Sequence, residues 1–68
     1  MKEMLQEMVN GYGFGISVEE FVEIIYHKVS RMQKYDVGIL NERYLEVDGR
    51  DFQFRKTRSK GHWTVVEF

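Results

Sequence analysis

Residues 44–68 alternate between apolar and polar side chains with a period of two, which predicts short β-strands separated by turns. Asp48-Gly49 lies between two such segments, and a two-residue Asp-Gly loop is the strongest short-range signal of a β-hairpin. Counting outward from this loop predicts the cross-strand pairs Val47 with Arg50, Glu46 with Asp51, Leu45 with Phe52 and Tyr44 with Gln53. One pair, Glu46 with Asp51, argues against the register because like charges directly opposite each other are unfavourable.

A second turn is predicted at Ser59-Lys60-Gly61, as a three-residue loop with Gly61 in the left-handed conformation. The pairs predicted across it are Arg58 with His62, Lys56 with Thr64, Phe54 with Val66 and Phe52 with Phe68. Together the two turns predict an apolar sheet face made of Leu45, Val47, Phe52, Phe54, Val66 and Phe68. They predict a polar outer face made of Tyr44, Glu46, Asp51, Gln53, Arg55, Thr57, Trp63, Val65 and Glu67. A slip of one residue would mix the two faces.

A helix is predicted to begin at Ser17, where a capping box with Glu20 lies inside a hydrophobic staple. The staple is formed by the flanking residues Ile16 and Phe21. Apolar residues then recur at spacings of three and four, giving a stripe that can be buried against the sheet: Val18, Phe21, Val22, Ile25, Val29 and Met32. We expect this helix to end near Asp36, with Gly38 as its terminator.

A shorter amphipathic helix is predicted before it, with an apolar stripe made of Met1, Met4, Leu5, Met8 and Val9. Asn10-Gly11 ends this helix, and Tyr12 and Phe14 are expected to fold back onto the core. The predicted fold is therefore α+β, with two helices packed on one face of a three-stranded antiparallel β-meander and one domain over residues 1–68. Residues 37–43 fit two alternatives, an early start of the first strand or a loop anchored by apolar side chains.

The chain has 68 residues and no cysteine, so its small core must be stable without disulfides. The absence of cysteine fits a reducing compartment. No apolar run reaches the roughly 18 residues that a membrane helix needs. Acidic residues also interrupt the N-terminal segment, where a signal peptide would be continuously apolar. We therefore expect a cytoplasmic protein that does not bind a membrane.

Charge is nearly balanced over the whole chain, with 10 basic and 11 acidic residues, but it is unevenly distributed. Residues 1–27 contain one basic and five acidic residues, which gives a net charge of −4. Residues 50–62 contain five basic residues and one acidic residue, which gives +4 with histidine neutral. Such a bipolar distribution can steer an oppositely charged partner, or can let copies of the chain associate.

The basic hairpin around the second predicted turn is the best candidate for a binding surface. The candidate residues, for a protein partner or for nucleic acid, are Tyr44, Arg55, Lys56, Arg58, Lys60, His62 and Trp63. A basic ribbon with an exposed aromatic residue can hold phosphates and stack a base. The alternative is structural, because basic residues on sheet edges prevent aggregation and an arginine often packs over a tryptophan ring. The balanced net charge also counts against nucleic acid.

Two other motifs carry little chemistry. Residues 11–15 are rich in glycine and precede a helix, but they follow a helix and lack the Gly-Lys-Ser/Thr ending of a phosphate loop. Glu20, Glu23 and His27 share a helical face, but no second cluster supplies the further ligands that a metal needs. The sequence offers no nucleophilic side chain at a local spacing from a general base. We therefore expect no enzyme, no cofactor, no metal and no small-molecule substrate.

Protein binding is the leading functional hypothesis. Flexible methionines and exposed aromatic residues suit adaptable protein contacts, and the residues in question are Met1, Met4, Met8, Tyr44 and Trp63. We expect a small non-enzymatic interaction module, a regulator or inhibitor of microbial or phage type, that binds a protein partner and can form a homodimer. The alternative hypothesis is a nucleic-acid-binding protein that uses the basic hairpin.

Overall fold

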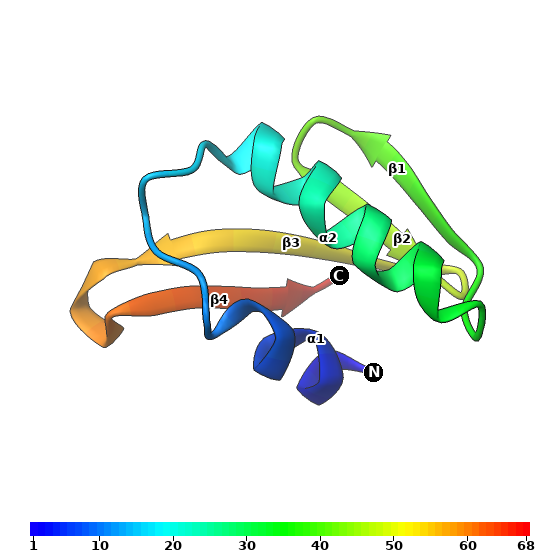
Figure 1. The fold of residues 1–68 in the computed structure, drawn as a ribbon, viewed down its shortest axis with the longest axis horizontal. Coiled ribbons are helices and arrows are strands. Elements are labelled where there is room, and N and C mark those ends of the chain that lie inside the picture. Colours follow the sequence, from blue (N-terminus) through cyan, green and yellow to red (C-terminus); the bar gives the residue numbers. More distant parts are fainter.

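The structure is a computed structural model that describes residues 1–68, except for the side chain of Lys60. Its elements in chain order are α1 (Lys2–Val9), α2 (Val18–Met32), β1 (Val37–Asn41), β2 (Tyr44–Val47), β3 (Arg50–Thr57), the short 3₁₀ helix η1 (Arg58–Lys60) and β4 (His62–Glu67). The strands form one antiparallel sheet in the order β1-β2-β3-β4, with the helices on one of its faces (Figure 1). The predicted two-layer α+β arrangement is confirmed, but the prediction of three strands is wrong because the sheet has four.

The strand missing from the prediction is β1, which follows α2 at the edge of the sheet. It joins β2 through a tight turn at Glu42-Arg43, in which the Arg43 N–H donates to Asn41 Oδ1 at 2.9 Å. The start of β1 is tied to the β2–β3 turn, since Asp48 N–H donates to the Asp36 carbonyl oxygen and Asp36 N–H donates to Asp48 Oδ1, both at 2.8 Å. These contacts stabilise a strand that has no clear alternation of its own.

The predicted first hairpin is confirmed in its turn and in its register. Asp48 and Gly49 have positive φ angles of 52° and 78°, as the two-residue turns favoured in hairpins require. The observed pairs are those expected from the Asp-Gly loop: Val47 with Arg50, Glu46 with Asp51, Leu45 with Phe52 and Tyr44 with Gln53. The like-charged pair is therefore retained. It lies on the sheet face away from the helices, because its neighbour Leu45 is buried beneath them.

The predicted register of the second hairpin is wrong by one residue. Its loop spans residues 58–61, four residues instead of three, although Gly61 is left-handed as expected, with a φ of 69°. The observed pairs are Thr57 with His62, Lys56 with Trp63, Arg55 with Thr64, Phe54 with Val65, Gln53 with Val66 and Phe52 with Glu67. The sides predicted for β4 are therefore exchanged. The helix side receives Trp63, Val65 and Glu67, and the outer side receives His62, Thr64, Val66 and Phe68.

Burial of Trp63 is the physical reason for this difference. Its side chain is fully buried, and its ring stacks on Phe21 with centroids 4.0 Å apart and an interplanar angle of 15°. The indole Nε1–H donates to the Gly13 carbonyl oxygen at 3.0 Å. A buried tryptophan is worth about 3–5 kcal/mol relative to alanine, whereas one cross-strand pair contributes about 0.2–1 kcal/mol. The predicted register would have left this ring in water, so the longer loop is favoured.

The predicted start of α2 is confirmed, but its predicted end is wrong. Ser17 is the N-cap, and its hydroxyl oxygen accepts a hydrogen bond from the Glu20 N–H at 3.2 Å. α2 ends at Met32, because Gln33 takes the left-handed conformation with a φ of 56°. Gly38, the predicted terminator, is instead a residue of β1. Met32 is 37% exposed, so the last position of the predicted apolar stripe is not buried.

The hydrophobic core lies between the helices and the sheet. α2 lies over β1, β2 and β3, and α1 lies beside β4 (Figure 1). The buried apolar side chains are Leu5, Val9, Phe21, Val22, Ile25, Val29, Leu45, Val47, Phe52, Phe54, Trp63 and Val65. Tyr12 packs edge-on against Phe21, and Phe14 packs edge-on against Trp63. The expectation that Tyr12 and Phe14 fold back onto the core is therefore confirmed.

The outer edge of β4 is covered by a side chain from α1. Gln6 Nε2 donates to the Trp63 carbonyl oxygen at 2.7 Å, and Gln6 Oε1 accepts from the Val65 N–H at 2.9 Å. A neighbouring strand would make the same two bonds, one donated and one accepted, so the Gln6 amide takes the place of a backbone peptide group. Two backbone groups at the middle of this edge are thereby hydrogen-bonded and are not free to pair with another strand.

Replacing Gln6 by leucine should lower the free energy of unfolding by about 1–3 kcal/mol, because a carbonyl and an N–H of β4 lose their partner beside the core. Urea denaturation followed by circular dichroism measures the change. The matched control is the same replacement at Glu7, which is exposed on the same helix and should change stability by less than about 0.5 kcal/mol. Equal stability of the two variants would contradict the bridging role of Gln6.

Fluorescence of Trp63, the single tryptophan of the chain, reports directly on the register of β4. Because the ring is buried among apolar side chains, its emission should be shifted to the blue relative to the unfolded chain and should resist quenching by iodide. Emission at the unfolded position, with free access to iodide, would show that the tryptophan faces solvent.

Candidate protein-interaction surface

The hairpin that joins β3 to β4 holds most of the residues predicted to bind a partner, but they do not form one cluster. Lys56 and Trp63 lie on the helix side, where Lys56 Nζ donates to the Phe14 carbonyl oxygen at 3.0 Å and lies 5.5 Å from the Trp63 ring centroid. The predicted exposure of Trp63 is wrong, since the ring is enclosed in the core. Arg58 is exposed at the hairpin tip in η1. Lys60 belongs to the same element, and its side chain lies outside the described part of the structure.

Three of the predicted binding residues stay together on the sheet face that the helices leave uncovered: Tyr44, Arg55 and His62. We call this surface the open face, and it comprises Tyr44, Glu46, Asp51, Gln53, Arg55, Thr57, His62, Thr64, Val66 and Phe68. Polar contacts order its side chains. Arg55 Nε donates to Gln53 Oε1 at 2.9 Å, and the hydroxyl oxygens of Thr57 and Thr64 lie 2.6 Å apart in a hydrogen bond.

An aromatic pair lies on the open face and was not predicted there. The rings of Tyr44 and Phe68 are 5.4 Å apart and tilted by 59°, and Phe68 is 63% exposed. Phe68 reaches this face because of the observed register of β4, and its N–H donates to the Asp51 carbonyl oxygen at 2.9 Å. The alternation of apolar and polar residues was the sequence signal for Phe68. The predicted three-residue loop placed Phe68 on the wrong face of the sheet.

Charge changes along the open face in the direction of the strands. Glu46 and Asp51 lie near the β2–β3 turn, and Arg55 lies toward the hairpin tip, with Tyr44 between them. A partner therefore meets an acidic zone, an aromatic zone and a basic zone in that order. Each zone favours a different group, and a matching surface must carry all three in register.

A groove of about 420 Å³ lies on the helix side, between the start of α2 and the end of β1. Its lining residues are Glu19, Glu20, Val22, Glu23, Ile39, Asn41 and Glu42. Val22 and Ile39 contribute apolar side chains to its lining, and the glutamates contribute acidic ones. Arg43 lies outside this lining, with its Nε 3.9 Å from Glu19 Oε1. The groove was not predicted, because it joins residues that are about twenty positions apart in the chain.

The helical face of Glu20, Glu23 and His27, considered above as a weak metal motif, is divided in the structure. Glu20 and Glu23 line the groove, whereas His27 packs edge-on against Tyr26 with ring centroids 5.3 Å apart. Within the described residues, no group of three or more histidine, cysteine, aspartate or glutamate side chains is placed to hold a metal ion.

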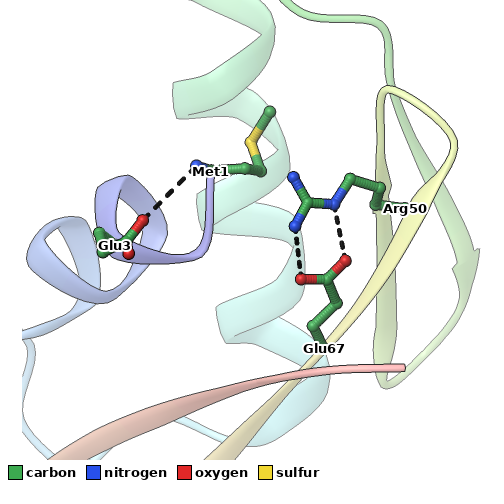
Figure 2. Close-up of polar contacts among 4 residues, drawn as sticks. All are labelled: Met1, Glu3, Arg50 and Glu67. Atoms are coloured by element: carbon green, nitrogen blue, oxygen red, sulfur yellow. Dashed lines mark hydrogen bonds and ion pairs between the residues drawn. The ribbon is translucent and has the colours of Figure 1, made fainter.

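Glu67 was predicted on the outer face but lies on the helix side, where it pairs with Arg50 (Figure 2). Arg50 Nε donates to Glu67 Oε2 and Arg50 Nη2 donates to Glu67 Oε1, both at 2.6 Å. These hydrogen bonds, helped by the attraction between the charges, lower the pKa of Glu67 and raise the pKa of Arg50. The pair joins the end of β4 to the start of β3 at the edge of the core.

The lowered pKa of Glu67 predicts a stability difference that depends on pH. The native carboxylate binds a proton less readily than the unfolded one, so its contribution is complete above the ordinary carboxyl pKa of 4.5 and is lost as the pH falls through the native pKa. Glu67→Gln should therefore be less stable than the wild type above the ordinary carboxyl pKa of 4.5, and this gap should narrow as the pH falls through the lowered native pKa. Urea unfolding at several pH values measures it, with Glu7→Gln on exposed α1 as the control. A gap that is independent of pH would contradict the pairing with Arg50.

No protein-family model, curated protein or solved structure matches this chain. In the part of the chain that the structure describes, neither helix has the length and apolar character needed to cross a membrane. We therefore infer function from the chemistry of the open face and of the groove.

Proposed function

We propose that this protein is a small non-enzymatic interaction module that binds another protein through its open face. The observation that carries the proposal is the aromatic pair of Tyr44 and Phe68 on a sheet face that has no helical cover. Tyrosine, phenylalanine and arginine are enriched where proteins bind each other, and buried aromatic anchors supply much of the binding energy. Arg55 lies on the same face and supplies the third type of residue.

The zones of the open face define the chemistry of the partner. The complementary surface has an apolar recess for Phe68, basic groups opposite Glu46 and Asp51, and acidic groups opposite Arg55. Such a module acts by occupying the surface of its partner, as a regulator or inhibitor does. No step in this action makes or breaks a covalent bond.

The nucleic-acid hypothesis receives less support from the geometry. Trp63, the residue proposed to stack a base, is in the core, and Lys56 contacts the Phe14 carbonyl oxygen on the helix side. Glu46 and Asp51 would repel phosphates from the open face. Among the described side chains, Arg55 and His62 are the basic residues of the open face, and Arg58 lies at the hairpin tip, which is a small basic set for a groove that follows a nucleic-acid backbone.

Replacing Tyr44 and Phe68 together by serine should weaken binding to the partner by at least roughly tenfold while leaving the fold intact, since Phe68 is mostly exposed. Immobilised wild-type and variant proteins are incubated with host lysate, and retained proteins are quantified by mass spectrometry. The affinity of each protein retained only by the wild type is then measured in purified form by calorimetry. Met32→Ser, an exposed apolar residue on the helix side, is the matched control and should bind as the wild type does.

Equal retention of every protein by the wild type and the Tyr44 and Phe68 double variant would contradict the proposal. A salt titration with short DNA and RNA tests the alternative. Salt-sensitive binding that is lost when Arg55 and Arg58 are changed to glutamine would replace the protein-binding function by nucleic-acid binding.

A further inference from the structure

The two edges of the sheet differ in how they are covered. β4 is shielded by α1, and Gln6 bonds two of its edge groups. β1 pairs with β2 on one side, and no strand of the described structure pairs with its other side. Proteins usually protect such an edge with lysine, proline or an inward-pointing charge. The sequence of β1, Val-Gly-Ile-Leu-Asn, contains none of these residues. Its protection is limited to its short length and to a register shift between Ile39 and Asn41, which leaves residues 37–39 in regular pairing with β2.

Exposed apolar side chains accompany this open edge. Ile39 is 41% exposed and Leu40 is 50% exposed, and among the described residues they are two of the four large hydrophobic side chains with high exposure. An unpaired strand edge with apolar side chains beside it is a template for a strand from another chain. The charges of α2, the helix that lies over β1, then decide which chain can pair with this edge.

α2, which lies over β1, is acidic at its start and basic at its end. Glu19 and Glu20 are in its first turn, Arg31 is in its last turn, and Lys34 follows. α2 runs antiparallel to β1, because the groove joins the first turns of the helix to the end of the strand. If a second strand pairs antiparallel with β1 and carries a helix like α2, that helix runs antiparallel to α2. Its basic end then lies beside the glutamates at the start of α2.

A second copy of this chain meets that requirement. Pairing β1 with its own copy in antiparallel orientation gives a two-fold axis, and the interface is the same patch on both chains. Because α2 of each copy contacts β1, this pairing brings the two α2 helices to the junction between the copies, on the same side of the joined sheet. Glu20 and Glu23 of each copy then face Arg31 and Lys34 of the other.

We infer that two copies of this chain associate edge to edge through β1, with α2 packed beside its symmetry mate. The two four-stranded sheets become one continuous antiparallel sheet, with the helices of both copies on the same side. The strand contact is short, five residues from each copy, so the dimer is in equilibrium with monomer and is sensitive to salt. The inference goes beyond the proposed function, because the copies meet through the backbone edge of β1 and through α2 on the helix side, and not through the aromatic pair of the open face.

The oligomeric state of the full chain tests this inference. Sedimentation of the wild type over concentrations from micromolar to near millimolar should show a monomer–dimer equilibrium, and Leu40→Lys should remove the dimer by placing a charge on the edge. The double variants E20K/E23K and R31E/K34E should each raise the dimer dissociation constant by roughly tenfold or more, because attraction between the copies becomes repulsion. Circular dichroism confirms that each variant is folded.

Mixing the two charge variants provides the decisive measurement. E20K/E23K with R31E/K34E should form a heterodimer at least as stable as the wild-type dimer, since both helix contacts regain opposite charges. The matched control mixes E3K/E7K with R31E/K34E, which changes charge by the same amount on exposed α1, beside the covered edge of the sheet. This control pair should form no preferred heterodimer.

Three outcomes would overturn the inference: a wild type that stays monomeric over the whole range, a dimer unaffected by Leu40→Lys, or equal heterodimer formation by the control mixture. A dimer that is lost instead in the double variant of Tyr44 and Phe68 would place the contact on the open face. The folded E20K/E23K monomer separates the two proposals, because its changes lie on the helix side, away from the open face. If it still binds the protein partner, loss of the dimer leaves the proposed function standing.

Discussion

Burial of the Trp63 indole is the interaction on which the rest of the β4 arrangement depends. The ring is held by three separate parts of the chain, through stacking on Phe21, a hydrogen bond to the Gly13 carbonyl oxygen and the Lys56 ammonium group near its face. Because side chains alternate along a strand, the inward position of Trp63 decides on which face of the sheet all the remaining residues of β4 lie. It brings Val65 into the core and sends its neighbours outward. The composition of the open face is therefore a consequence of where one large aromatic side chain is most stable.

Signals that act over a few residues predicted the first hairpin and the start of α2 correctly, whereas the end of α2, the fourth strand and the register of β4 were not predicted correctly. Asp48-Gly49 and Ser17 each favour one local backbone conformation, so the first hairpin and the start of α2 follow from sequence. The second turn is different, because Ser59-Lys60-Gly61 is compatible with a loop of three or of four residues. The choice depends on the packing of Trp63 against a helix more than forty positions away. β1 was missed for a related reason, since its five residues are stabilised by neighbours and do not alternate.

The residues of the candidate surface could be predicted only where the sequence showed which face of the sheet each strand residue occupies. Tyr44 and Arg55 belong to β2 and β3, whose register comes from the Asp-Gly turn, and they lie on the outer face as expected. His62 was named as a binding residue without its face being assigned, and the corrected register places it beside them. Phe68 required the correct length of the second loop. The groove required knowledge of β1 and of how α2 lies over it, so no local pattern in the sequence pointed to it.

The two edges of this small sheet differ in a way that would allow the proposed dimer to form without fibres. A chain of 68 residues buries a limited core, and pairing with a copy adds buried surface without lengthening the chain. A sheet with two free edges can continue to add copies, which is the route to aggregation. Here Gln6 occupies backbone groups of β4 that a further strand would need, and the proposed pairing of β1 with itself would use the remaining edge on both copies. In the proposed dimer, association therefore closes at two copies. That arrangement would also place the two open faces side by side on one surface, so that one dimer would present both aromatic pairs to the proposed partner.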